Sequence, residues 1–457
     1  MVINFYDYMK KTILIMTLLI ILGFRELSSQ VKKWTIQDCI NYAIENNIGL
    51  QRDKLQTRSY EADLVKSKMD LTPTLNLASN NMMTFGRSVN PVDNSITLSQ
   101  SITNSYGIQS DLNLFNGFIT LNTIAANKFM VKAGLEMEKI TRNRLVVDIL
   151  GQFYQILYAK GLEDAAKMQL DLSEKQLFRV SKMVETGREA VSKQYELESR
   201  VSADRLAYVT AQNTTSQAIT TMKQMLQLEP GTEFDILLPD LDQIIIQDVT
   251  FSTDSVYALA AEVLPRLKEI TYELNAAKKQ LAASRGYNYP KLTTSGLIGT
   301  GYYKTIGSES PAASYRDQLK NNNEQRIYLT LSIPIFNRYS AARSVKLAKL
   351  KRDDTQLRLE LEKNNLYSEI ENACLNYNRG RAEYEASRDN LSYNHKSFTS
   401  VEKKFESGLI DVTDYTVAKT TLFSAETEAL RTKLQLLVRK LAVELYSTGE
   451  YENLVLN

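Results

Sequence analysis

The sequence predicts a mainly α-helical chain that also carries membrane β-strands and is built from an internal duplication. Three observations support this fold class. Residues of the first half recur in the second half at a nearly constant spacing, and each half contains one very long segment without proline. Ahead of each long segment, the spacing of the apolar residues changes from a helical period to a period of two.

The composition excludes several classes of protein. The chain has 55 Lys and Arg residues against 53 Asp and Glu residues, so it lacks the basic surplus typical of proteins that bind nucleic acid. Its single histidine, His395, stands alone, and the sequence has no motif for a nucleotide, a metal ion or a catalytic triad. Cys39 and Cys374 lie inside helical patterns and are expected to be buried and unpaired. We therefore predict that the protein is not an enzyme and has neither a cofactor nor a metal site.

Residues 1–30 are typical of an export signal peptide. Lys10 and Lys11 precede an apolar run over 12–24, which is too short to span a bilayer comfortably, and small and polar residues follow it. The alternative is a membrane anchor that is retained. Beyond this segment no apolar run is long enough for a transmembrane helix, so a membrane crossing by the mature chain would require β-strands.

The duplication defines the expected domains. An offset of 217 residues pairs Pro73 with Pro290, and an offset of 221 residues pairs Gly187 with Gly408, each at the end of a matching heptad stripe. Each repeat is predicted to contain a helix, two strands, a long helix and a final helix. The expected segments are a signal peptide at 1–30, a first repeat at 31–227, a belt or linker at 228–252, a second repeat at 253–447 and a short C-terminal tail at 448–457.

Each repeat is expected to begin with a helix that ends before a proline. These helices cover about 35–71 and 253–287, and Pro265 marks a kink or a displaced start in the second one. The long helices cover about 117–186 and 338–407, which corresponds to rods of roughly 105 Å at ~1.5 Å per residue. Helices of this length persist only where they bury stripes against neighbours, so we expect a wall of helices.

Two strands are expected between the helices of each repeat. The incoming strands cover about 74–85 and 290–303. The outgoing strands alternate between apolar and polar residues over Tyr106–Leu114 and, more cleanly, over Ile327–Ile335. Strands of about ten residues with one apolar face suit a bilayer crossing. The hairpin loops, expected to be polar, irregular and extracellular, cover about 87–100 and 304–324.

The alternative for these strands is a soluble four-stranded sheet packed on a helix. No spare amphipathic helix remains to cover such a sheet, and the export signal also argues against it. Within a lipid bilayer, four strands cannot close a barrel, and open sheet edges are not tolerated. Three copies of the chain would together supply twelve strands, so the sequence predicts a trimeric 12-stranded β-barrel with four strands per chain.

The most telling stretch of sequence is 408–425, in which a glycine turn is followed by an Asp-containing helix start and a run of Ala, Thr and Leu. Residues 187–193 are its duplicate. With the length and the duplication, this stretch resembles the helix–turn–helix tip of the TolC-like outer-membrane efflux proteins, and the resemblance covers about 34–450. It implies a homotrimeric tube whose β-barrel lies in the outer membrane of a Gram-negative cell and continues as a long α-helical barrel in the periplasm.

The resemblance also implies a function. The protein would be the passive exit duct of a tripartite efflux or type I secretion system, gated at its periplasmic tip. That tip would dock a periplasmic adaptor (a membrane fusion protein), which connects to an inner-membrane pump, and residues 228–252 would contribute to a belt around the helices. The alternative is an exported coiled-coil adhesin or a structural periplasmic scaffold, which two identically placed period-two hairpins disfavour.

The resemblance identifies candidate gate residues. Asp414 matches the first gate aspartate of the family, but Val417 stands where the second is expected and Phe405 replaces an aromatic residue that carries a hydroxyl. Lys193 occupies a position that is acidic in the best-known members, and it is expected to pair with Asp414 or with Asp411 across protomers. The gate is therefore either one acidic ring with a hydrophobic collar or a Lys–Asp network. Alternatively, the two aspartates serve the helix start through capping and the helix dipole.

The two glycine turns are the expected docking surface for the adaptor. Glycine permits the positive φ that reverses a helix sharply. The residues expected to form this tip are Val184, Gly187, Val191, Gly408, Leu409 and Val412.

Overall fold

The computed structural model describes residues 33–89, 94, 96–98, 100–237, 249–306 and 313–449. It divides into two compact units, each assembled from three stretches of chain. The first unit comprises Met1–Asn47, Asp148–Ile246 and Leu391–Leu434, and the second comprises Ile48–Val147, Gln247–Asn390 and Gln435–Asn457. The expected signal peptide lies outside the described residues, as do parts of the expected linker and C-terminal tail.

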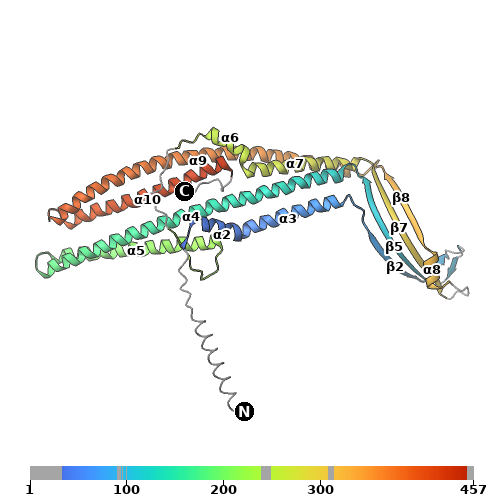
Figure 1. Ribbon diagram of the computed structural model, residues 1–457, viewed down its shortest axis with the longest axis horizontal. Coiled ribbons are helices and arrows are strands. Elements are labelled where there is room, and N and C mark those ends of the chain that lie inside the picture. Colours follow the sequence, from blue (N-terminus) through green and yellow to red (C-terminus); the bar gives the residue numbers. More distant parts are fainter. Residues whose placement is uncertain are drawn as a thin grey trace, which may run out of the picture. The chain divides into compact units, whose positions relative to one another are not determined.

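Helices dominate both halves of the chain, and strands are grouped ahead of the longest helices (Figure 1). The first half contains β1 (Lys33–Trp34), α2 (Ile36–Asn46), α3 (Ile48–Met69), β2 (Asn76–Thr84), β3 (Arg87–Val89), β4 (Ile96–Leu98), β5 (Gln100–Phe115), α4 (Ile119–Glu185), α5 (Val191–Leu226) and β6 (Asp235–Ile236). The second half contains α6 (Thr253–Val263), α7 (Pro265–Arg285), η2 (Gly286–Asn288), β7 (Lys291–Ile306), α8 (Tyr315–Asn321), β8 (Glu324–Ser332), α9 (Ser340–Glu406) and α10 (Val412–Thr448).

The helices of the two halves match in length. Helices α4 and α9 have 67 residues each, as the proline-free segments predict, and α5 and α10 have 36 and 37 residues. Helices α2 and α6 have 11 residues each. No helix among the described residues is both long enough and apolar enough to cross a lipid bilayer.

The prediction of a single helix at the start of each repeat is wrong in both halves. Two helices occupy that stretch, α2 and α3 in the first half and α6 and α7 in the second. Asn47 ends α2 at φ −64° and ψ 120°, and Leu264 ends α6 at φ −65° and ψ 126°, both in the extended region. In the second half Pro265 is the first residue of α7, which confirms the displaced start predicted from this proline. The first half makes the same break without a proline.

The start of α2 is fixed by a capping box. The Thr35 side chain accepts a hydrogen bond from the Asp38 backbone N–H at 3.1 Å, and the Asp38 carboxylate accepts one from the Thr35 N–H at 3.0 Å. Just before it, Trp34 pairs in parallel with Ile236 of the expected belt segment. Within α2, Cys39 is buried and free, and Cys374 of α9 is also buried and free, as expected from their helical positions.

The second unit contains a four-stranded antiparallel sheet in the order β2-β5-β7-β8. Two strands come from each half of the chain. In this order β2 and β8 are the edge strands. Side chains alternate between the two faces of a strand, so the register shows which residues share a face. Apolar residues of all four strands concentrate on one face, which includes Leu77, Tyr106, Ile108, Leu112, Ile298, Ile327, Leu329 and Leu331. The other face includes Asn80, Ser105, Gln109, Asp111, Thr293, Ser295, Tyr328 and Thr330.

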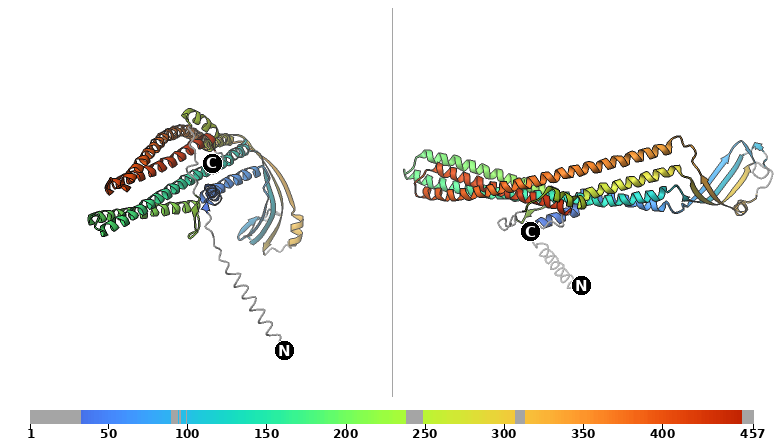
Figure 2. Two further views of the ribbon diagram at one scale, coloured as in Figure 1. Left: turned by 60° about the vertical axis from the view of Figure 1, so that its left-hand side comes forward. Right: turned by 90° about the horizontal axis from the view of Figure 1, so that it is seen from above.

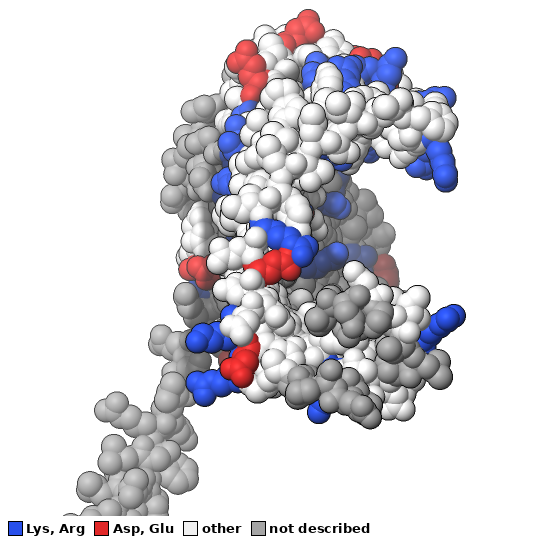
Figure 3. Space-filling view, turned by 90° about the vertical axis from the view of Figure 1, so that its right-hand side faces the viewer, with Lys and Arg blue, Asp and Glu red and all other residues white. Residues whose placement is uncertain are grey.

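Helix α8 covers one end of this apolar face, where Tyr315 contacts Tyr106 and Tyr302, and the described residues leave most of the rest of the face exposed. Ile327 is 89% exposed, Leu329 is 68% exposed and Ile298 is 58% exposed. Figure 3 shows that uncharged residues make up most of the described surface at this end of the unit. The four strands contain five charged residues, which lie toward the strand ends: Asp111, Lys291, Lys304, Glu324 and Arg326.

The hairpin regions are more regular than the sequence indicates. In the first, β3 and β4 pair with each other, with Arg87 opposite Leu98. In the second, Ser314 caps the short helix α8 by accepting a hydrogen bond from the Asp317 N–H. Helix α8 packs on β7, where the Gln318 side chain donates to the Tyr303 carbonyl at 3.0 Å (Figure 2). Strand β8 also ends at Ser332, three residues earlier than expected, because the next segment contains Pro334.

The first unit is a cluster of long helices. Helix α5 runs back beside the second half of α4 (Figure 2), and the start of α10 belongs to the same unit. Its interior is apolar for the most part, with Ile149, Phe153, Ile156, Leu197, Val201, Met222, Leu226 and Ala425 buried. This cluster carries both glycine turns predicted from the sequence.

Candidate functional site

Two helix reversals with the same geometry form the candidate site in the first unit. Gly187 after α4 and Gly408 after α9 both adopt φ 72°, a conformation that other residues rarely take. The Gly187 N–H donates to Val184 at 2.9 Å, and the Gly408 N–H donates to Phe405 at 3.0 Å. A second bond spans each turn, from Arg188 to Met183 and from Leu409 to Lys404. Both turns are therefore Schellman motifs.

Asp411 acts as the cap of α10. Its carboxylate accepts a hydrogen bond from the Asp414 N–H at 3.0 Å, and its carbonyl accepts one from the Tyr415 N–H at 3.3 Å. The bond from Asp414 and the nearby Lys193 charge lower the pKa of the Asp411 carboxyl. The capping interpretation is thus confirmed for Asp411.

The other two predicted gate residues on α10 lie on its exposed surface. Asp414 is exposed, and Val417, one helical turn later, is 62% exposed. Continuing at helical spacing, Thr421 and Ser424 are exposed as well. One face of α10 therefore presents a carboxylate followed by a short apolar and hydroxyl-bearing stripe.

Lys193 makes its ion pair within its own helix. Its ammonium lies 3.2 Å from the carboxylate of Glu196, and Glu196 also accepts a hydrogen bond from the Thr413 hydroxyl at 3.3 Å. Helix α5 is thereby linked to the first turn of α10. Within one chain, the charge of Lys193 acts on Asp411 through space.

Phe405 belongs to an aromatic cluster that sequence reasoning missed in part. Its ring stacks on Tyr415 with the centroids 4.5 Å apart, and Arg179 of α4 lies 6.0 Å from the Phe405 centroid. Tyr415 is only 2% exposed and also contacts Phe398, 5.6 Å away.

Five of the predicted site residues share one cavity of about 180 Å³. These residues are Lys193, Phe405, Gly408, Asp411 and Val412. The remaining predicted residues lie elsewhere: Asp414 and Val417 on the open face of α10, and Val184, Gly187, Val191 and Leu409 around the two turns. Leu409 is 75% exposed and Val191 is 50% exposed, so the two turns carry apolar side chains on their surface.

A buried polar network lies farther along the same helices and was not predicted. Asp204 of α5 is 5% exposed, lies 3.2 Å from the guanidinium of Arg200 and accepts a hydrogen bond from the hydroxyl of Ser173. Arg200 in turn donates to the Thr420 hydroxyl at 2.7 Å. Helices α4, α5 and α10 are therefore joined by charge-assisted hydrogen bonds.

Lys419 completes this network. Its side chain is 6% exposed, and its ammonium donates to the carbonyl of Gln169 at 2.9 Å. Burial lowers the pKa of Lys419 to about 8, although the neighbouring Asp204 carboxylate favours the charged form. Lys419 and Thr420 thus fix the register of α10 against α4 and α5, two turns after Asp411.

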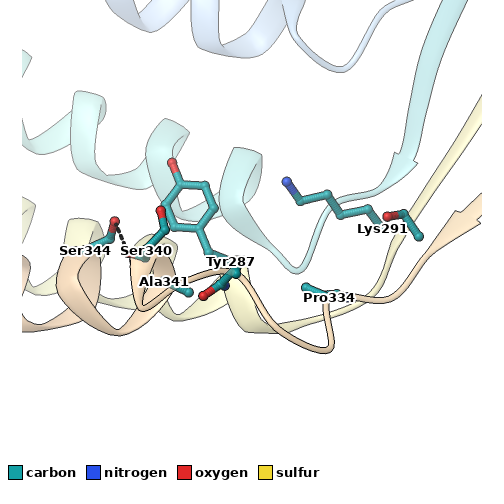
Figure 4. Close-up of a pocket in the computed structure, with 8 residues that line it drawn as sticks. Tyr287, Lys291, Pro334, Ser340, Ala341 and Ser344 are labelled. Carbon is teal, nitrogen blue, oxygen red and sulfur yellow. Dashed lines mark hydrogen bonds between the residues drawn. The ribbon is translucent and has the colours of Figure 1, made fainter.

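A second cavity lies in the other unit, where β7 begins, β8 ends and α9 begins (Figure 4). Its volume is about 440 Å³. Lys291 points toward the ring of Tyr287, with its ammonium 5.6 Å from the ring centroid. Serine hydroxyls of Ser332, Ser340 and Ser344 complete a polar lining on the polar side of the sheet. No cluster of His, Cys, Asp or Glu that could hold a metal ion occurs among the described residues.

Comparison with known proteins adds three findings. Residues 256–447 match the family model described as outer membrane efflux protein. No curated protein matches the chain. In fold, the chain is similar to CusC (TM-score 0.75, 16% identity, 91% of this chain and 92% of that chain covered) and to the outer membrane channel CmeC of Campylobacter jejuni (TM-score 0.75, 14% identity, 91% and 86% covered). It is also similar to the MtrE outer membrane channel of Neisseria gonorrhoeae (TM-score 0.70, 17% identity, 91% and 89% covered).

Proposed function

We propose that this chain is a TolC-like outer membrane efflux protein, located in the outer membrane with an extension into the periplasm. In this proposal it is the passive exit duct of a tripartite efflux or type I secretion system. The proposal adds assembly, gating and partners to the family assignment.

The observation that carries the proposal is the four-stranded sheet with one apolar face and two open edges. In a bilayer every backbone N–H and C=O group requires a partner, so β2 and β8 cannot stay open. Three chains that join β2 to β8 form a homotrimeric 12-stranded β-barrel, within the range of natural barrels. The apolar face then contacts lipid, and the polar face, with Lys291 at its base, lines the lumen.

The matching helices support an internal duplication. The two halves repeat one order of elements, with 67-residue helices followed by Schellman turns at Gly187 and Gly408. A second independent match is the break before α3 and α7, where Asn47 and Leu264 share one backbone conformation. In the trimer, the long helices would line up into an α-helical barrel that continues the β-barrel.

The open face of α10 is the proposed gate. Three copies of Asp414 would converge near the channel axis, attract cations and repel one another, because a narrow passage focuses their field. Val417 would form a hydrophobic collar one turn away. Phe405 holds the turn beneath the gate, while Asp411 caps the helix that presents Asp414. Within one chain Lys193 already pairs with Glu196, so a contact with a neighbouring protomer would share or replace this ion pair.

The two turns are the proposed docking surface for a periplasmic adaptor, or membrane fusion protein, which connects the duct to an inner-membrane pump. Support comes from the exposed apolar residues Val191 and Leu409 beside Gly187 and Gly408, with Val184 and Val412 half-buried beneath them. Small apolar patches with a polar rim are typical of protein contact sites. An exported adhesin or periplasmic scaffold would need neither these turns nor an apolar sheet face.

A planar-bilayer recording with the purified trimer tests the function. We expect discrete channels that prefer cations, and we expect Asp414→Asn to lower the ratio of cation to anion permeability because it removes the acidic ring. Asp411→Asn is the matched control, since asparagine retains the cap and Asp411 points into its own turn. The proposal of a duct is wrong if the protein gives no conductance, and the gate assignment is wrong if Asp414→Asn leaves the permeability ratio unchanged.

A further inference from the structure

Two helices of the second unit carry exposed stripes at heptad spacing. On α3 the stripe consists of Ile48, Gln51, Leu55, Arg58, Ala62, Val65 and Met69. On α9 it consists of Arg343, Leu347, Leu350, Asp354, Leu357, Leu361 and Asn364. Leu55 is 61% exposed, Val65 is 54% exposed and Leu357 is 65% exposed, so these positions do not serve the core of their own chain. Heptad stripes are surfaces for a second helix.

The two stripes fit each other in one antiparallel register. Their three- and four-residue steps run in the same order when α3 is followed backward and α9 forward. We call each pair of residues that face each other in this register a rung. The rungs are Met69 with Arg343, Val65 with Leu347, Ala62 with Leu350, Arg58 with Asp354, Leu55 with Leu357, Gln51 with Leu361 and Ile48 with Asn364. Apolar residues meet apolar residues on three rungs, and the single rung with a charge on each side joins opposite charges.

The Arg58–Asp354 rung distinguishes this register from its neighbours. A shift by one heptad would place Arg58 against Leu347 or against Leu361, which would leave a guanidinium in an apolar seam. Both residues are exposed in the chain, and Asp354 forms a surface ion pair with Lys351 at 3.4 Å. A polar residue at one seam position is a known means of specifying helix register at some cost in stability.

The two stripes also stand next to the two sheet edges. Helix α3 leads into β2 and α9 follows β8, at opposite borders of the sheet (Figure 1). When β8 of one chain joins β2 of the next, α9 of the first chain approaches α3 of the second in antiparallel orientation. The two stripes do not meet within one chain, because α3 and α9 are separated by the whole width of the sheet.

We propose that α3 of one protomer packs on α9 of the next through this seam, and that the Arg58–Asp354 pair sets the register in which neighbouring protomers join. The inference rests on the proposed duct, since the trimer brings the two helices together. Beyond the trimer itself, it names the residues through which neighbouring protomers contact each other. The partner is a second copy of this chain, because the matching stripe, the opposite charge and the adjoining open edge are all present on it.

Cysteine cross-linking tests the register. Under mild oxidation in outer membranes, a chain with Val65→Cys and Leu347→Cys should move from the monomer position to covalent dimers and trimers on a denaturing gel. A chain with Val65→Cys and Leu357→Cys is the matched control, because these positions lie ten residues out of register and should remain monomeric. The unsubstituted chain, with Cys39 and Cys374 buried, should also remain monomeric.

Charge exchange tests the role of the polar rung. We expect Arg58→Asp to reduce the trimer that survives in detergent, because it sets two carboxylates against each other, and we expect Arg58→Asp with Asp354→Arg to restore it. The seam is wrong if trimers form and conduct but the in-register cysteines do not link, or if the double exchange fails to restore the trimer. If no trimer or conductance is found with any variant, the proposed duct fails and the seam fails with it.

Discussion

At the scale of single residues, Lys419 is a cation held in the interior of a helix cluster. Burial lowers its pKa from 10.5 to about 8, since a desolvated ammonium is costly even beside Asp204. The folded chain therefore releases this proton near pH 8, whereas the unfolded chain retains it up to about pH 10.5. Between these values the unfolded state binds more protons, so this group makes the folded state more stable as pH rises.

We expect Lys419→Met to remove that dependence. In the unsubstituted protein, the contribution of Lys419 to the free energy of unfolding should rise by about 3 kcal/mol between pH 8 and pH 10.5. Below pH 8 both states are protonated and the contribution is constant. Denaturant midpoints of the detergent-solubilised protein, measured at steps across this range, give the slope for each variant.

Lys403→Met is the control for this experiment, because Lys403 is exposed on the last turns of α9. It removes the same charge from solvent and should leave the slope of the unsubstituted protein intact. Equal slopes for Lys419→Met and the unsubstituted chain would show that Lys419 does not titrate below its ordinary pKa in the folded protein.

The site residues differ in how far sequence could define them. The spacing of Asp411 and Asp414 already matches a cap and the third residue of a helix, so the role of Asp411 was available from the pattern. Asp204 was not, because its partners Ser173 and Lys419 come from two other helices that only the fold brings together. A heptad pattern can place positions such as 204 on a buried stripe, but it does not show which buried side chains pair with one another across helices.

At the scale of elements, the break between α2 and α3 shows what a comparison of the two halves of the chain can reveal. Asn47 and Leu264 occupy equivalent positions at the offset of 217, and both precede the first residue of a helix. Pro265 makes this visible in the second half only. If the helix start at Pro265 is transferred to the first half by the same offset, it predicts the break at Asn47. The local sequence around Asn47 alone is typical of a continuous helix.

We predict that Ile48→Pro is tolerated. Asn47 has the extended conformation that a following proline requires, and the N–H of a first helical residue has no acceptor within its helix. The change should leave the free energy of unfolding the same or raise it by about 0.4–1 kcal/mol, because proline lowers the conformational entropy of the unfolded chain. Arg52→Pro, one turn later, should instead cost about 3 kcal/mol because it breaks an internal hydrogen bond. Thermal midpoints of both variants provide the comparison, and similar losses for the two would refute the equivalence with Pro265.

The hairpin regions were predicted less well than the helices and strands. Their polar composition indicates loops, yet Ser314 and Asp317 supply a cap signal for α8, and its Gln318 bonds to Tyr303 of β7 stabilise it. A helix of 7 residues depends on such contacts, because its own hydrogen bonds cannot sustain it. Periodicity therefore locates the long elements, while the short ones depend on tertiary contacts that no local pattern contains.

At the scale of the whole molecule, the sheet joins the two halves of the chain into one surface. Alternation predicts two faces for each strand, but it cannot show which faces align. The register does, since Ile108 of β5 lies opposite Ile298 of β7 and Tyr106 lies opposite Thr300. The apolar residues of both halves of the chain thereby form a single face that is largely exposed and that a bilayer can cover.

Adjacent residues of β7 allow a direct test of this face, because Ile298 lies on the apolar side and Leu297 on the polar side. We expect Ile298→Lys to cost about 2–4 kcal/mol when the barrel enters the membrane, since the ammonium would face hydrocarbon, and to reduce the trimer recovered from outer membranes. Leu297→Lys introduces the same side chain one residue away, where it would face water in the lumen. It should preserve the trimer and shift the permeability ratio toward anions. Equal recovery of the two variants, or loss of both, would mean that the apolar face does not meet lipid.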